Sequence, residues 1–124
     1  MNLIKHFIKF WLPPIFYAIL IFWFSSLEEP FGLKFAEDNL DKLLHMLEYG
    51  IFGYLLMRAV HGSDKTMSWK IGILISFIIG TFYGFTDELH QSVVPGRFAT
   101  VSDFLFDTLG VILGSLVYRK SAKD

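Results

Sequence analysis

The chain has 124 residues, of which 53% are hydrophobic and 18% are aromatic. This composition is too apolar for a soluble domain of that length, so it predicts one integral membrane domain covering residues 1–124. The net charge of −1 provides no excess of Lys and Arg for a nucleic-acid surface. The chain contains no cysteine, which excludes thiol catalysis, disulfides and thiolate metal sites within it.

The first predicted element is a membrane helix over about residues 10–27. No charged side chain occurs between Lys9 and Glu28, and a run of this length can cross a hydrocarbon core roughly 30 Å thick. Pro13 and Pro14 in its first turns predict either the start of the helix or a kink, because proline lacks the N–H that continues a helix. A cleaved signal peptide is the alternative, although the end of the run lacks the small-residue pattern of a cleavage site.

Three further apolar segments predict membrane helices over about residues 42–60, 70–90 and 101–118. Turn-forming sequences connect them, with Gly62-Ser63-Asp64 after the second helix and Pro95-Gly96 after the third. Short connections of this kind favour antiparallel neighbouring helices. The sequence therefore predicts an all-α integral membrane protein of four helices.

The positively charged residues are distributed unevenly between the two sides of this arrangement. Eight of the 11 Lys and Arg residues fall on the side of the two termini, and three fall on the other side. Because Lys and Arg collect in cytoplasmic segments, this asymmetry predicts a multi-pass plasma-membrane protein with both termini in the cytoplasm. The eight are Lys5, Lys9, Arg58, Lys65, Lys70, Arg119, Lys120 and Lys123, and the three are Lys34, Lys42 and Arg97.

Polar residues follow one face of each of the last three predicted helices. Residues spaced by three or four positions share a helix face. On the second predicted helix this spacing relates Asp41, His45 and Glu48, with Lys42 and Tyr49 beside them. The third helix has Gly80, Gly84, Asp87 and Gln91, with Glu88 beside them, and the fourth has Asp103, Asp107, Gly110 and Gly114. Glycines at this spacing let membrane helices approach closely. Ionisable groups cost roughly 2.5–3.5 kcal/mol each at the bilayer centre, so their grouping predicts a site. We therefore expect the three stripes to converge in one polar pocket that faces outward.

The residue types in these stripes suggest several kinds of site. A carboxylate and an imidazole could act as acid and base, and the candidate catalytic residues are His45, Glu48, Asp87, Glu88, His90 and Asp103. The candidate ligand-binding residues are Lys42, Tyr49, Gln91, Arg97 and Asp107. His45, Glu48 and His90 could also hold a divalent metal such as zinc. The alternative to a metal is a hydrogen-bonded network of histidine and carboxylates.

Some of these residues have a second interpretation that needs no ligand. Asp41 and Asp103 could cap helix N-termini, where acids are favourable. Arg97 could clamp a phosphate or carboxylate, or it could form an internal salt bridge to Asp103 or Glu88. Glu48 lies two turns inside its predicted helix, so capping does not explain it.

Several short motifs resemble those of the VanZ-like family. They are Ser25-Ser26, Asp41-Lys42-Leu43-Leu44-His45, Asp87-Glu88-Leu89-His90-Gln91, Pro95-Gly96-Arg97, Ser102-Asp103 and Leu109-Gly110, and they occur in the expected order over almost the whole chain. The chain departs from the family pattern at Asp107, where many members are expected to have Asn. The family is named after a protein of a glycopeptide-resistance gene cluster that lowers sensitivity to teicoplanin in Gram-positive bacteria.

The resemblance implies a bacterial plasma-membrane protein that acts at the cell envelope. It implies no agreed reaction, so two classes of function stay open. In the first, the outward pocket binds or remodels a lipid-linked envelope precursor or its headgroup, with lower teicoplanin sensitivity as the expected effect. In the second, the chain is an intramembrane hydrolase or transferase that acts on an envelope lipid headgroup through a histidine and carboxylates.

Overall fold

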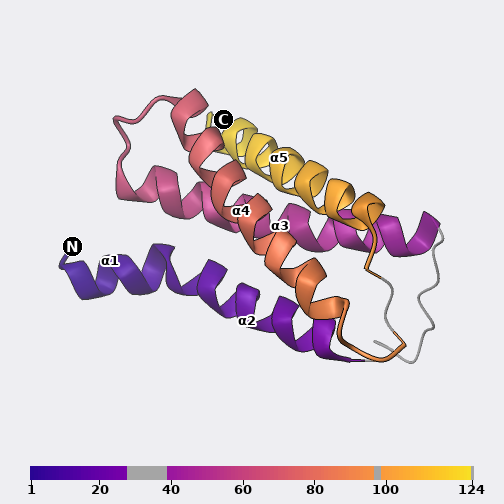
Figure 1. The fold of residues 1–124 in the computed structure, drawn as a ribbon. Helices are drawn as coiled ribbons and strands as arrows, with labels where there is room; N and C mark the ends of the chain where they lie inside the picture. The colour runs from indigo at the N-terminus through magenta and orange to yellow at the C-terminus, as the bar shows by residue number, and fades with distance from the viewer. Residues whose placement is uncertain (28–38, 97–98, 124) are drawn as a thin grey trace.

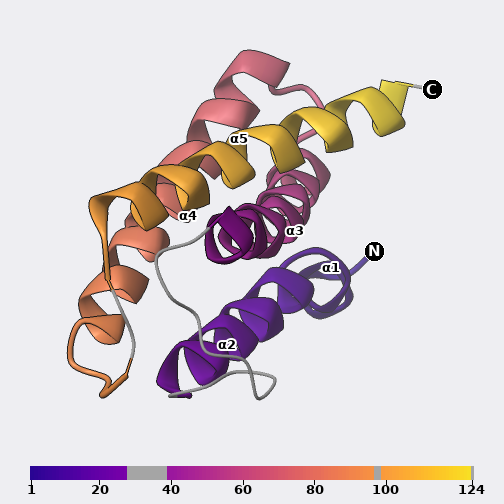
Figure 2. The same cartoon turned by 90° about the vertical axis from the view of Figure 1, so that its right-hand side faces the viewer.

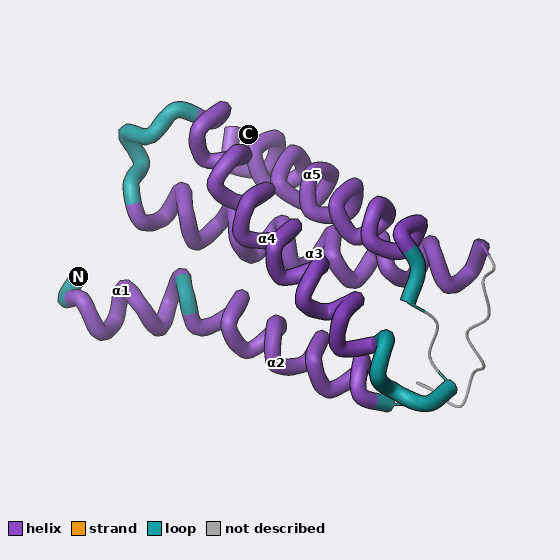
Figure 3. The backbone as a smooth tube through the Cα atoms, in the orientation of Figure 1, coloured by secondary structure: helices purple, strands orange, loops and turns teal. Residues whose placement is uncertain are grey.

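The computed structural model describes residues 1–27, 39–96 and 99–123, and the regular elements in these ranges are all α-helices. They are α1 (Leu3–Phe10), α2 (Leu12–Ser26), α3 (Asn39–Ser63), α4 (Trp69–Gln91) and α5 (Val101–Lys123) (Figure 1; Figure 3). The predicted all-α class is confirmed. Helices α3, α4 and α5 include the predicted ranges 42–60, 70–90 and 101–118 and extend beyond them, because hydropathy marks only the apolar part of a helix.

The first predicted helix, over about residues 10–27, corresponds to α2, and a separate helix, α1, precedes it at an angle of 42°. Helix α1 begins after Asn2, whose side chain accepts a hydrogen bond from the Lys5 N–H at 2.9 Å, and Trp11 is its C-cap. Helix α2 begins with Pro13 and Pro14 in its first turn, and neither has an N–H to donate to the preceding carbonyls. The prolines therefore mark both a helix start and a bend, and the described residues form five helices where four were predicted.

Helices α4 and α5 are each long and apolar enough to cross a membrane, and α1 with α2 would add a third span if the bent pair forms one. The exposed surface of these helices is largely apolar. On α4, for example, Ile78, Phe82 and Leu89 are 57%, 70% and 56% exposed. Such a surface is unfavourable in water, whereas lipid solvates it well. The exposed faces are thus those expected of a helical membrane protein.

Glycines set the packing between α3 and α5, which form the most extensive helix contact in the described chain. A Cβ atom added at Gly53 would lie 2.7 Å from the Val111 Cα, and one added at Gly114 would lie 2.8 Å from the Gly50 carbonyl carbon. Neither position can hold a side chain, because the neighbouring atoms belong to the opposite backbone. The glycines predicted to pack inward do so. Gly110 and Gly114 of α5 meet α3 at Met46, Gly50 and Tyr54, whereas Gly53 of α3 meets Val111, and the sequence analysis singled out none of these four α3 residues.

The turn between α3 and α4 follows from local hydrogen bonds. The Asp64 carboxylate accepts hydrogen bonds from the Thr66 hydroxyl at 2.6 Å and the Thr66 N–H at 2.9 Å. These bonds favour the ionised form and lower the pKa of Asp64. The Ser68 side chain then caps α4 by accepting a hydrogen bond from the Ile71 N–H at 3.3 Å. The predicted turn at Gly62-Ser63-Asp64 is therefore followed by an ordered start of the next helix.

Side-chain contacts define two different ends of the helical bundle. At one end the α1–α2 junction is joined to the last turn of α3, where His6 Nε2 lies 2.9 Å from the Gly62 carbonyl oxygen and Trp11 Nε1 donates to Ser63 Oγ at 2.8 Å. Both chain termini lie at this end (Figure 1). Figure 2 faces the opposite end, where α2 and α4 finish and α3 and α5 begin.

Candidate functional site

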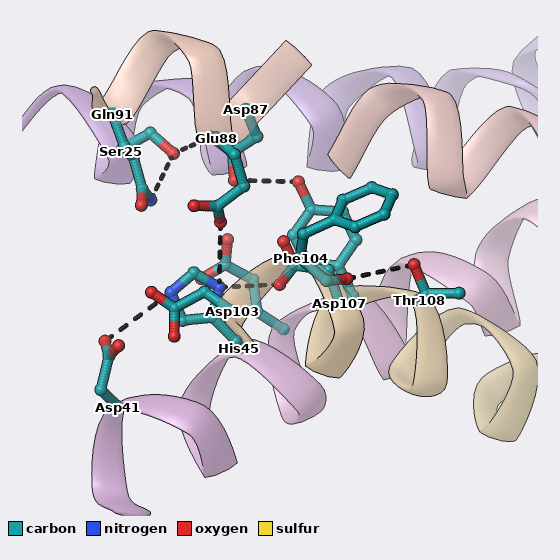
Figure 4. Close-up of polar contacts among 12 residues, drawn as sticks. Ser25, Asp41, His45, Asp87, Glu88, Gln91, Asp103, Phe104, Asp107 and Thr108 are labelled. Atoms are coloured by element: carbon teal, nitrogen blue, oxygen red, sulfur yellow. Dashed lines mark hydrogen bonds and ion pairs between the residues drawn. The ribbon is translucent and has the colours of Figure 1, made fainter. Parts of the chain in front are cut away.

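A group of polar side chains is buried at the end of the bundle opposite to the termini. Four helices contribute to it, because the last turns of α2 and α4 meet the first turns of α3 and α5 there (Figure 4). We call this group the polar cluster, and its buried members are Ser25, Asp41, His45, Asp87, Glu88, Gln91, Asp103 and Asp107. The structure thus brings together residues from all three predicted stripes.

His45 lies at the centre of the polar cluster and is 7% exposed. Its Nδ1 is 2.7 Å from the Asp107 Oδ1 and 3.8 Å from the Glu88 Oε1. Its Nε2 is 3.6 Å from the Asp41 Oδ1, one helical turn earlier in α3. Both ring nitrogens therefore face carboxylates (Figure 4), and the contact with Asp107 is short enough for a hydrogen bond.

A second set of contacts centres on Asp87 and joins α2, α3 and α4. The Tyr49 hydroxyl donates to Asp87 Oδ2 at 2.9 Å, and the Ser25 hydroxyl donates to Asp87 Oδ1. The Gln91 side-chain amide donates to Ser25 Oγ at 3.2 Å. Ser25 is the member that the sequence analysis did not assign to the site. The sequence offered one indication of this role, because serine side chains in membrane helices often form hydrogen bonds with a neighbouring helix.

Several oxygen atoms of the polar cluster are buried without a hydrogen-bond donor among the described residues. They are both carboxylate oxygens of Glu88, Oδ1 of Asp103, Oδ2 of Asp107 and the side-chain oxygen of Gln91. Buried polar atoms are almost always paired in folded proteins, since an unpaired one costs about 1–3 kcal/mol. The cluster therefore has unused capacity to accept protons, donor groups or a cation.

Two sets of three residues bring potential metal ligands within 4.8 Å of one another. One set is Asp41, His45 and Asp103, and the other is His45, Glu88 and Asp107. The predicted set of His45, Glu48 and His90 is not assembled, because within the described ranges neither group includes Glu48 or His90. A metal bound by His45 would instead use Glu88 of α4 with Asp107 of α5, or Asp41 of α3 with Asp103 of α5.

His90 faces away from the central imidazole, and Glu48 belongs to neither set of potential metal ligands. The His90 ring stacks on Phe22 with centroids 4.4 Å apart, and its Nε2 is 2.9 Å from Ser26 Oγ, so it faces α2. Glu48 is half-buried, and its carbonyl oxygen accepts a hydrogen bond from the Tyr17 hydroxyl of α2 at 3.0 Å. At about 100° per residue, Glu48 lies only about 60° around α3 from His45, so it stays on the same side of the helix but outside both ligand sets.

The remaining predicted residues fall into three cases. Thr100 caps α5 by accepting a hydrogen bond from the Asp103 N–H at 3.0 Å, so Asp103 is not the cap and its carboxylate lies near His45. Lys42 is half-buried in the first turns of α3. Arg97, predicted to bind an anion or form a salt bridge, lies outside the described residues.

Comparison with known proteins gives one match that covers nearly all of the chain. The sequence model of a family described as VanZ/LLP1 matches residues 4–122, a range that includes every member of the polar cluster. Neither a curated protein nor a solved structure matches the chain.

Proposed function

Because the chain belongs to the VanZ/LLP1 family, we propose that it is a bacterial plasma-membrane protein whose polar cluster faces the cell exterior and binds a lipid-linked component of the envelope. The observation that carries this proposal is the buried cluster of one imidazole and several carboxylates at one end of an otherwise apolar bundle. Ionisable groups inside a membrane protein are costly to bury and most often serve a ligand or a reaction.

The proposal requires four membrane spans, formed by α1 with α2, α3, α4 and α5. Helix α3 has 25 residues, about 37 Å at 1.5 Å per residue, which is enough to cross a bilayer. Its Asp41 and His45 are buried toward the other helices, whereas Leu43, Leu47 and Ile51 are 46%, 55% and 52% exposed. The face of α3 that would contact lipid is therefore apolar despite the polar residues in its sequence.

The distribution of charge supports the orientation. Arg58 lies in the last turns of α3, near the chain termini, and its side chain donates to the Lys9 carbonyl oxygen at 2.7 Å. The exposed residues Lys65 and Lys70 flank the turn between α3 and α4 at the same end. Positive charge at that end favours the cytoplasm, and this would direct the polar cluster to the exterior.

Cysteine labelling is expected to report this orientation directly, since the chain has no cysteine of its own. Val93 follows α4 and is 77% exposed, and Ser121 is exposed near the end of α5. A membrane-impermeant maleimide applied to intact cells should label Val93→Cys and not Ser121→Cys, while permeabilised cells should label both. Labelling of Ser121→Cys alone in intact cells would reverse the proposed orientation.

The polar cluster is rich in hydrogen-bond acceptors, and this suggests the chemistry of its ligand. The two Glu88 oxygens and the Gln91 side-chain oxygen have no donor among the described residues. A headgroup carrying hydroxyl, amide or ammonium groups would supply such donors. Binding of this headgroup would change what teicoplanin and related agents reach at the membrane surface.

We expect Glu88→Gln to abolish protection against teicoplanin in a Gram-positive host that lacks its own copy of the protein. The substitution keeps the size of the side chain but replaces one acceptor oxygen by an amide donor. Minimum inhibitory concentration, measured with membrane abundance, should fall to that of the host without the protein. The control is Asp64→Asn, which alters an exposed acid at the other end of the bundle and should protect fully. Full protection by Glu88→Gln at normal abundance would contradict the proposal.

A second candidate function is an intramembrane hydrolase or transferase that acts on an envelope lipid headgroup. The 2.7 Å contact between His45 Nδ1 and Asp107 favours it, since a carboxylate on one ring nitrogen orients an imidazole for proton transfer at the other. Turnover of a radiolabelled lipid-linked precursor in proteoliposomes separates the two functions. Formation of a new product that Asp107→Leu prevents would favour the enzyme, and binding without product would favour the first proposal.

A further inference from the structure

The two ring nitrogens of His45 lie at different distances from carboxylates. The distance on the Nδ1 side suits a hydrogen bond, and the distance on the Nε2 side suits two ligands of one metal ion. The 2.7 Å separation between Nδ1 and Asp107 Oδ1 is that of a charge-assisted hydrogen bond. The 3.6 Å separation between Nε2 and Asp41 Oδ1 is too long for a hydrogen bond. Two ligand atoms that bind one ion at about 2.0–2.2 Å in tetrahedral geometry are about 3.3–3.6 Å apart, which is the spacing on the Nε2 side.

We propose that His45 Nε2, Asp41 and Asp103 form a binding site for a divalent metal ion. The three ligand atoms lie within 4.8 Å of one another. Asp103 provides an independent observation, because its side chain is 2% exposed and its Oδ1 has no hydrogen-bond partner among the described residues. Buried charges in proteins are paired or bind metal ions, and the two carboxylates would neutralise the charge of one divalent ion.

Asp107 completes the arrangement as a positioning residue. Metal-binding histidines usually donate their other ring N–H to a carboxylate, which fixes the tautomer and the orientation of the ring. A hydrogen bond donated by Nδ1 to Asp107 would leave Nε2, which lies 3.6 Å from the Asp41 Oδ1, as the ring nitrogen that binds the ion. A metal held on the other side by Glu88 and Asp107 would have to replace this hydrogen bond.

The ligand set indicates which ions fit. One imidazole nitrogen with two carboxylates suits Mn²⁺ or Zn²⁺, whereas Ca²⁺ and Mg²⁺ prefer oxygen ligands alone. This inference goes beyond the proposed function, because the metal site involves Asp41, His45 and Asp103, and the headgroup proposal rests on Glu88 and Gln91. Its test measures metal binding alone, so it succeeds or fails independently of any effect on teicoplanin.

The experiment is pulsed electron paramagnetic resonance of Mn²⁺ added to the purified full-length protein in detergent, with competition by Zn²⁺. We expect saturable binding with ¹⁴N coupling from one imidazole. The coupling should disappear in His45→Gln and persist in His90→Gln, a matched histidine outside the site. Asp103→Asn should weaken Mn²⁺ binding at least about tenfold, a larger loss than Glu88→Gln causes, whereas Asp64→Asn at the other end of the bundle should leave the affinity unchanged.

Two results would overturn the assignment. The first is wild-type protein with no saturable Mn²⁺ binding or no ¹⁴N coupling, a result that needs no variant to fold. The second is loss of binding in Glu88→Gln with full binding in Asp103→Asn, which would place the ion on the Nδ1 side. Circular dichroism and size-exclusion chromatography verify that each variant is folded, and Asp41→Asn replaces Asp103→Asn if the latter is not.

Discussion

His45→Leu is expected to destabilise the protein by about 3–5 kcal/mol, the cost typical of removing one partner from a buried charged pair. The leucine cannot donate to Asp107, which is 1% exposed and 2.7 Å from the imidazole in the native structure. It also leaves no polar group between Glu88 and Asp41, the two other carboxylates that face the ring. Several acids would then share one buried region without the group at its centre.

Denaturant or thermal unfolding in detergent would measure this loss, and two variants serve as comparisons. His90→Leu removes an imidazole that contacts Ser26 and Phe22 at a partly exposed position, so it should cost about 1 kcal/mol or less. The double variant His45→Leu with Asp107→Leu should recover part of the stability, because apolar replacement of both partners avoids an orphaned charge. Equal losses for His45→Leu and His90→Leu would show that His45 is not the centre of the cluster.

Gly114→Ala is expected to be the most damaging of the small substitutions between α3 and α5. The added methyl group would lie 2.8 Å from the Gly50 carbonyl carbon and 2.8 Å from the Tyr54 backbone nitrogen. Backbone atoms cannot move aside as a flexible side chain can, so the two helices would have to separate. Overpacking of this kind costs about 1–3 kcal/mol or more, which exceeds the gain in helix propensity of about 1 kcal/mol from replacing glycine.

The matched control is Gly84→Ala in α4, where the nearest atom to an added Cβ is the Asp107 Cβ at 3.4 Å. That distance is ordinary contact with a side chain, so the variant should unfold within a few degrees of the wild type. Because α3 carries His45 and α5 carries Asp107, helix separation in Gly114→Ala should also lengthen their hydrogen bond. The ¹⁵N shifts of His45 would report this change, and unchanged shifts with unchanged stability would show that the helices are not held together at this glycine.

The sequence by itself determined the helical class, the ranges of the later helices and the faces that carry polar residues. Local spacing is sufficient for these features, because residues three or four apart share a helix face and apolar runs mark the segments that avoid water. The same spacing predicted that His45, Asp87, Asp103 and Asp107 lie on inward faces, and each is buried.

Only the tertiary structure decided which residues meet. The pattern along one helix does not show which helix it contacts, so the sequence could not show that Gly110 and Gly114 of α5 pack on Gly50 of α3. It also could not separate His90, which faces α2, from His45, which faces α4 and α5. These contacts depend on the rotation of each helix about its own axis. Steric fit at the glycine contacts sets that rotation, and the rotation determines which polar side chains face each other across the bundle.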